Sequence, residues 1–145
     1  MLHTPFKRAE DAPAQGCFAR EARGQAELLP EYAAGLKDIS GFSHLILLYH
    51  FDRAEGFELV TKPLLDKEKR GVFATRYFKR PNPIGLSIVE LLGIHDNVLE
   101  IGWVDMLDGT PLLDVKPYVG LFDARENVCD GWVADASELR GNGRL

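Results

Sequence analysis

The decapeptide Phe42–Phe51, FSHLILLYHF, contains the longest apolar run in a chain of 145 residues. The run is rich in residues that favour extended backbone, and it is too short and too unbroken for a surface helix. It predicts a β-strand that is buried on both faces. His44 and His50 are six residues apart, so their side chains should point to the same side of that strand. A metal site is one interpretation of this pair, but no further ligand lies at suitable spacing. We therefore expect no metal, and histidines that line the core or the wall of a cofactor site.

Shorter strands are predicted on both sides of this run, separated by glycine, proline and Asp-Gly turns. Pro30–Leu36 should form one or two helical turns, and Asp108-Gly109 a tight turn between the last two strands. Six or so strands with one or two short helices indicate a mainly β protein. We expect a single small β-barrel domain, closed or nearly closed, over residues 1–145. The predicted strands are Gly24–Leu29, Phe42–Phe51, Gly71–Phe78, Ser87–Leu92, Val98–Val104 and Leu112–Val115.

Composition and local motifs narrow the class of protein. The hydrophobic fraction of 46% and the charged fraction of 27% are those of a soluble globular protein. No apolar run approaches the roughly 18–20 residues that cross a bilayer, and the N-terminus has no secretion signal. Cys17 and Cys129 are lone thiols, which is typical of a cytoplasmic protein. The sequence has neither a GxGxxG turn nor a GxxxxGK[ST] loop, so a Rossmann fold and a P-loop are not expected.

Positive charge is concentrated in one stretch of an acidic chain. The net charge is −5, yet Lys62–Arg80 carries seven basic residues against Asp66 and Glu68, a net +5, which leaves −10 for the remainder. Binding of phosphate requires local rather than global positive charge, so this stretch is a candidate phosphate-binding patch. A solvated basic loop is the alternative interpretation.

The loop Arg76–Gly85 lies at the end of this stretch. Two prolines flank Asn82 and stiffen the backbone, and Gly85 is expected to let it turn back sharply. Arg76, Lys79 and Arg80 crowd the start of the loop. A stiff backbone beside fixed cations can hold an anionic or carboxylate-bearing ligand in one pose.

A second group of polar residues lies in Asp105–Tyr118, DMLDGTPLLDVKPY. Asp105, Asp108 and Asp114 are placed with Lys116 around a predicted turn. Loops held by a rigid sheet commonly carry site residues. The alternative is a hairpin turn whose aspartate satisfies backbone groups.

Four blocks of the chain together resemble the TrmO/TsaA family. They are His3–Lys7, HTPFK; Gly35–Phe51, GLKDISGFSHLILLYHF; Gly71–Ser87, GVFATRYFKRPNPIGLS; and Asp105–Tyr118. The resemblance implies a small β-barrel that dimerises and binds S-adenosylmethionine near the subunit interface. It implies methylation of N6 of N6-threonylcarbamoyladenosine at position 37, beside the anticodon of tRNA. From the comparison with the family we expect a slightly clipped first strand and no counterpart of the C-terminal domain of some bacterial members.

The resemblance also implies roles for individual residues, and the chemistry supports them. Arginine forks bind carboxylates and phosphates, and a carboxylate or tyrosine can take the proton from N6. The candidate catalytic residues are Asp105, Asp108 and Tyr118. The candidate cofactor contacts are Pro13, Ala14, Gln15, Asp52, Arg53, Arg76, Leu86, Asp105, Met106, Leu107 and Asp108. The candidate RNA or substrate contacts are Lys79, Arg80, Asn82 and Lys116.

Two other functions stay open at this point. One is a methyltransferase that uses the same cofactor on a small metabolite, which the net charge of −5 favours slightly. The other is a non-catalytic module that binds S-adenosylmethionine or an anion and regulates a partner.

Overall fold

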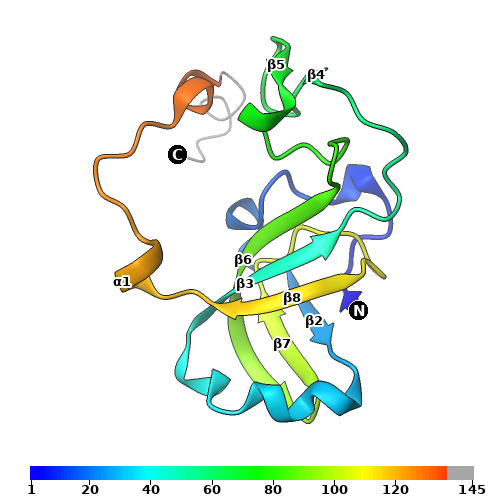
Figure 1. The fold of residues 1–145 in the computed structure, drawn as a ribbon, viewed down its shortest axis with the longest axis vertical. Coiled ribbons are helices and arrows are strands. Elements are labelled where there is room, and N and C mark those ends of the chain that lie inside the picture. The colour runs from blue at the N-terminus through cyan, green and yellow to red at the C-terminus, as the bar shows by residue number, and fades with distance from the viewer. Residues whose placement is uncertain (137–145) are drawn as a thin grey trace.

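A computed structural model describes residues 1–136 as a twisted antiparallel sheet flanked by short helical turns and loops (Figure 1). The predicted domain extends to residue 145, and residues 137–145 lie outside the described part of the chain. The strands are β1 Leu2–His3, β2 Arg23–Glu27, β3 His44–His50, β4 Val60–Thr61, β5 Arg70–Gly71, β6 Ile84–His95, β7 Val98–Gly102 and β8 Leu112–Pro117. The 3-10 helices are η1 Ala9–Asp11, η2 Gly16–Phe18, η3 Pro30–Leu36, η4 Ile39–Gly41, η5 Val72–Ala74 and η6 Gly131–Asp135, and α1 spans Gly120–Asp123.

Six strands form one sheet in the order β1-β2-β7-β6-β3-β8, and β4 pairs only with β5. Every neighbouring pair is antiparallel, which confirms a mainly β protein without a Rossmann fold. Within the described residues the sheet does not close into a complete barrel, so the expected closed or nearly closed β-barrel is confirmed only as a mainly β domain. Because β1 has only two residues, it joins the far edge through a single bridge, in which the Leu2 amide donates to the Thr110 carbonyl at 2.9 Å.

The central strand β3 places one face in the core. Leu45, Leu47 and Tyr49 are buried, whereas Ile46 and Leu48 on the other face are half-buried. Burial on both faces was therefore a wrong prediction. The outer face of the neighbouring strand β6 is more open still, with Ile84, Leu86 and Ile88 exposed. The core is completed by other buried residues of the sheet and its loops, namely Leu2, Ala26, Val89, Leu99, Ile101, Val104 and Met106.

The segment Gly71–Phe78 is not a strand, contrary to prediction. Only Gly71 belongs to β5, and Val72–Ala74 is the 3-10 helix η5. The Thr75 hydroxyl accepts a hydrogen bond from the Tyr77 amide and donates one to the Val72 carbonyl, which keeps the chain turning. The apolar residues here imitate a strand, but the backbone bonds locally instead of joining a sheet.

Other predicted elements are confirmed with changed limits. The pair Ser87–Leu92 and Val98–Val104 exists as β6 and β7, although β6 starts at Ile84 and β7 stops at Gly102. Trp103 ends β7 because it takes a positive φ of 63°. The turn at Asp108-Gly109 is present, with Gly109 at φ 75°, but β7 and β8 are not neighbours in the sheet.

Gly85 lies inside β6 and does not turn the chain back, contrary to expectation. It opposes Tyr49 across the β3–β6 ladder. A Cβ added at Gly85 would lie 2.1 Å from Cε2 of Tyr49, so the tyrosine ring occupies the space of the missing side chain. The glycine is therefore required by close packing of an aromatic ring on the strand.

Replacing Gly85 by alanine should lower the free energy of unfolding by about 1–3 kcal/mol, because the ring of Tyr49 must move or the strands must separate. Chemical denaturation measures the change. Gly35→Ala is the matched control, since a Cβ at Gly35 meets nothing within 4 Å. Equal stability of the two variants would contradict the packing argument.

Candidate functional site

A cavity of about 690 Å³ opens at the end of β3 and β6 where Tyr49 and Gly85 pack together. Its size is that of a small-molecule site. The N-terminal segment 9–15, the loop 73–82 and the turn 105–110 form its other walls. Aromatic residues from two of these regions, Phe51, Phe73, Tyr77 and Phe78, make much of the lining apolar.

The floor of the cavity holds a chain of hydrogen bonds. The Ser87 hydroxyl donates to Oδ1 of Asp105 at 2.5 Å, and the Gly16 amide donates to Oδ2 of the same carboxylate at 2.8 Å. The Tyr49 hydroxyl lies 2.9 Å from Ser87 Oγ. Because the Ser87 hydroxyl donates its only proton to Asp105, the Tyr49 hydroxyl must be the donor in its hydrogen bond with Ser87 Oγ. The chain is therefore directed from Tyr49 through Ser87 to Asp105.

Burial changes the acidity of both ends of this chain. Burial raises the pKa of Asp105, while the hydrogen bonds from Ser87 and Gly16 and the charge of Arg76 act in the opposite direction. Burial, together with the charge of Asp105, also raises the pKa of Tyr49 far above the usual tyrosine value. Tyr49 thus stays protonated as a donor, and Asp105 is a stronger proton acceptor than an exposed aspartate.

Two arginines lie on the wall of the cavity. Arg76 Nη1 donates to Gln15 Oε1 at 2.7 Å, and within residues 1–136 Arg76 forms no ion pair. Arg80 is held by the Thr75 carbonyl at 3.0 Å and leaves donors of its guanidinium unused. Both cations are placed to bind a carboxylate or phosphate. One donor nitrogen of Arg76, Nη1, is already hydrogen-bonded to Gln15.

Most of the residues singled out in the sequence lie around this one cavity. They come from four separate segments, which the fold brings together. The cofactor candidates in the lining are Pro13, Ala14, Gln15, Asp52, Arg53, Arg76, Leu86, Asp105, Met106 and Leu107, and the substrate candidates in it are Arg80 and Asn82.

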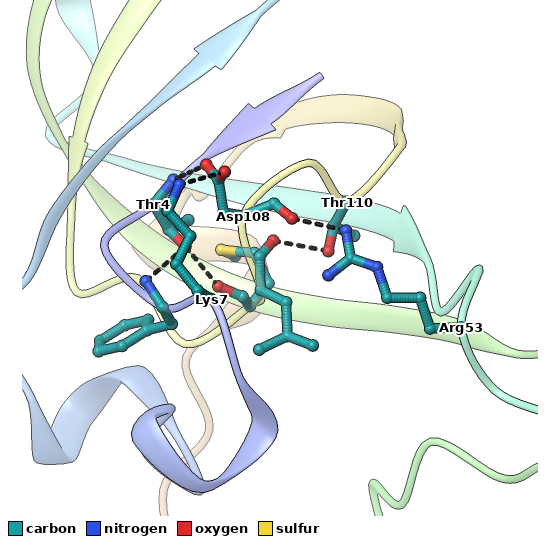
Figure 2. A network of polar contacts seen from close by, with 8 residues as sticks. Thr4, Lys7, Arg53, Asp108 and Thr110 are labelled. Carbon is teal, nitrogen blue, oxygen red and sulfur yellow. Dashed lines mark hydrogen bonds and ion pairs between the residues drawn. The ribbon is translucent and has the colours of Figure 1, made fainter.

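Asp108 is the cofactor candidate that the lining lacks. Figure 2 shows its carboxylate turned toward Thr4 and Lys7, with the Thr4 amide donating to Oδ1 at 3.0 Å and Lys7 Nζ 2.5 Å from Oδ2. The hydrogen bond from Lys7 is the main cause of a lowered pKa of Asp108. Arg53 binds the carbonyl of the same residue at 2.6 Å. Asp108 therefore ties the N-terminal segment to the turn that follows β7.

Three other candidates are not part of the cavity lining. Tyr118 packs near His44, with ring centroids 6.4 Å apart, at the opposite end of β3. Lys116 lies on β8 and pairs with Asp114 at 2.5 Å, and Lys79 is absent from the lining. His44 contacts Ser43 and Trp103, and within the described residues no group of three or more ligands could hold a metal.

Sequence reasoning missed Tyr49 and Ser87 as site residues. Both lie at inward positions of predicted strands, where the pattern indicates core packing. Only the register of β3 on β6 brings the Tyr49 hydroxyl to Ser87.

Residues 1–124 match the family model of the tRNA-methyltransferase O N-terminal domain. The chain is 53% identical over its full length to a probable S-adenosyl-L-methionine-binding protein of Pyrococcus abyssi, covering 81% of that protein. It is 36% identical to the tRNA (adenine(37)-N6)-methyltransferase of Escherichia coli, over 82% of this chain and 55% of that protein.

Solved structures give the same relationship. The crystal structure of TrmO from Pseudomonas aeruginosa superposes with a TM-score of 0.75 at 37% identity, covering 90% of this chain. The present chain spans 58% of the length of that structure. Among the described helices, none has the length and apolar character needed to cross a membrane. On the match of residues 1–124 and the identity with the Pyrococcus protein, the chain belongs to the tRNA-methyltransferase O family.

Proposed function

We propose that this protein transfers a methyl group from S-adenosylmethionine to N6 of N6-threonylcarbamoyladenosine at position 37 of tRNA, in the cytoplasm. The observation that carries the proposal is the half-buried Asp105, bonded to Ser87 and Gly16, in a cavity with cationic and aromatic walls. The printed names of relatives, S-adenosyl-L-methionine-binding protein and tRNA (adenine(37)-N6)-methyltransferase, support the cofactor and the RNA.

The residues of the cavity fit the parts of this cofactor. Its volume and aromatic walls suit an adenine ring, and Arg76 or Arg80 suits the carboxylate of the methionine part. Pro13, Ala14 and Leu107 supply apolar walls or backbone groups beside them. Bound S-adenosylmethionine supplies an electrophilic methyl group on a sulfonium, which keeps the electron pair of the broken carbon–sulfur bond.

The protein then has two tasks in the reaction. It must hold the acceptor nitrogen in line with the methyl carbon, and positioning of this kind lowers the barrier by several kcal/mol. It must also remove the N6 proton, because the lone pair of this nitrogen is delocalised into the purine and the carbamoyl group. We assign that proton to the carboxylate of Asp105, whose raised pKa makes it a better base. Asp108 and Tyr118 are not assigned a role, since both side chains face away from the cavity.

RNA is proposed to approach over the basic stretch Lys62–Arg80. Lys62, Lys67 and Lys69 are exposed, and Arg76 and Arg80 near the end of the stretch line the cavity. The ion pair of Arg70 with Asp66, at 2.8 Å, neutralises one cation and leaves the others for phosphate.

Incubation with S-adenosylmethionine and tRNA carrying N6-threonylcarbamoyladenosine should add one methyl group to that nucleoside. Mass spectrometry of the digested tRNA measures it, with the same tRNA lacking the threonylcarbamoyl group as control. Binding of the tRNA should weaken steeply with salt, because phosphate contacts release counterions. Cofactor binding without methylated RNA would contradict the proposal and indicate a non-catalytic module, and methylation confined to an RNA-free extract would indicate a metabolite enzyme.

Asp105→Asn should lower kcat about 100-fold or more, because the proton acceptor is lost. In the unchanged protein kcat should fall as acid protonates Asp105, at a pH above the usual aspartate pKa. Ser87→Ala should move this acid limb to higher pH, since the lost hydrogen bond stabilises the charged carboxylate. Rate measurements against pH test both variants.

Asp108→Asn is the matched control for these variants. Its carboxylate binds Thr4 and Lys7 outside the cavity, so the acid limb should stay in place. A shift of the limb in Asp108→Asn but not in Ser87→Ala would show that the base has been assigned to the wrong aspartate.

We infer a homodimer formed through the outer face of β3 and β6. Ile84, Leu86 and Ile88 are 49%, 42% and 38% exposed on this face, beside the half-buried Ile46 and Leu48. Contiguous exposed apolar residues of this kind mark an interaction surface. Ile84 and Leu86 also line the cavity, so a second copy on this face would lie beside the cofactor.

Ile88→Glu should convert the dimer to a monomer, because it places a charge on this apolar face at a residue outside the cavity lining. Analytical ultracentrifugation measures the mass. Leu29→Glu is the control, since Leu29 is 60% exposed but lies outside this face. A monomeric wild-type protein, or an Ile88→Glu variant that remains dimeric, would contradict the interface.

A further inference from the structure

A second cavity of about 710 Å³ adjoins the first. Gln15 and Arg76 line both cavities, and the 2.7 Å hydrogen bond between their side chains joins the two walls. Asp105 is close to this boundary, because its Oδ2 accepts from Gly16, the residue after Gln15. A group that enters the second cavity and points toward Gln15 would therefore approach the carboxylate to which we assign the proton.

The walls of the second cavity suit a flat ring. Aromatic side chains from three segments of the chain line it, namely Phe18, Phe73, Tyr77 and Trp132. The indole of Trp132 is fixed by a hydrogen bond from Nε1 to the Ala74 carbonyl at 2.7 Å. In Figure 1 the C-terminal turn η6, which carries Trp132, returns from α1 to lie near β5. Aromatic walls of this kind stack nucleobases that have left the RNA helix.

The same cavity presents a cation without an acidic partner. Arg20 lines it, and among residues 1–136 the guanidinium of Arg20 forms no ion pair. Its Cζ lies 5.1 Å from the ring centroid of Trp103. A guanidinium held on an aromatic face keeps its donors free in the plane of the fork, where they bind a carboxylate bidentately. Asp130 is the acidic residue of the described lining. Its carboxylate can accept a hydrogen bond from a hydroxyl of a ligand, but it would repel the carboxylate of a ligand.

The position of Arg20 is built into the fold. Trp103 has a positive φ of 63°, an uncommon conformation for a bulky residue that needs support from its surroundings. Its amide donates to the Ala22 carbonyl at 2.9 Å. Its carbonyl lies where Gly16 would carry a Cβ, at 1.9 Å, so the segment that leads to Arg20 packs directly on Trp103.

We propose that the second cavity receives the acceptor nucleoside, with the base between the aromatic walls and the carboxylate of its amino-acid substituent on Arg20. The inference rests on the proposed function, since it places the acceptor of that reaction. N6 then faces the Gln15–Arg76 boundary and the cofactor cavity beyond it. Arg20 selects a base that carries a carboxylate over plain adenosine.

The test is binding of the free nucleoside N6-threonylcarbamoyladenosine in the presence of S-adenosylhomocysteine. Both tryptophans of the chain lie at this cavity, Trp132 in its lining and Trp103 beneath Arg20, so binding should quench their fluorescence. Arg20→Gln should weaken binding about 10-fold or more, and Arg20→Lys should restore part of it, because a charged hydrogen bond is lost and then partly replaced. Lys37→Gln, an exposed change outside both cavities, should bind like wild type.

Adenosine is the matched ligand control, and Arg20→Gln should not change its affinity. The inference is overturned if the modified nucleoside does not bind wild type, if Arg20→Gln binds it equally well, or if it displaces S-adenosylhomocysteine. Methyl transfer to tRNA is measured separately. Transfer without Arg20-dependent binding overturns only this inference, whereas binding without transfer overturns only the proposed function.

Discussion

The packing of Tyr49 on Gly85 is the contact on which the site depends. It fixes how closely β3 and β6 approach, and it points the tyrosine hydroxyl at Ser87. Ser87 in turn holds Asp105 at the point where the chain leaves β7 for the next turn. A site residue on a loop is thereby positioned by the rigid centre of the sheet. This arrangement keeps a half-buried carboxylate hydrogen-bonded, because leaving it unpaired would be costly.

The electrostatics of the site follow from the same arrangement. Asp105 is raised in pKa by burial yet remains bonded to Ser87 and Gly16, so it can act as a base without losing its place. Arg76 is near enough to oppose the shift, and it also joins the two cavities through Gln15. Cofactor chemistry, proton transfer and acceptor binding are therefore coupled through very few side chains.

The sequence predicted those elements whose signal is local. The unbroken apolar run Phe42–Phe51 and the turn residues between the other predicted strands indicated a mainly β fold, and η3 agrees with Pro30–Leu36. Gly71–Phe78 was assigned wrongly because its composition favours extended backbone while its hydrogen bonds are local. Whether the sheet closes could not be predicted, since it depends on the length of β1 and one bridge to Thr110.

For the site, too, residues in local sequence motifs were predicted, and contacts that depend on the fold were not. Most residues of the cavity lining lie in the four blocks that resemble the family, so they could be identified from the sequence alone. The direction of the Asp108 side chain was not predictable, since its partners Thr4 and Lys7 are more than a hundred residues away. Tyr49 and Ser87 resemble core residues until strand register is known.

The central claim is that the cavity above Tyr49, Ser87 and Asp105 binds the cofactor. A crystal structure with S-adenosylhomocysteine tests it most directly. We expect the ligand in the 690 Å³ cavity, with its amino-acid carboxylate on Arg76 or Arg80 and Asp105 still bonded to Ser87. Electron density for the ligand elsewhere, or in this cavity with both arginines turned away from its carboxylate, would contradict it.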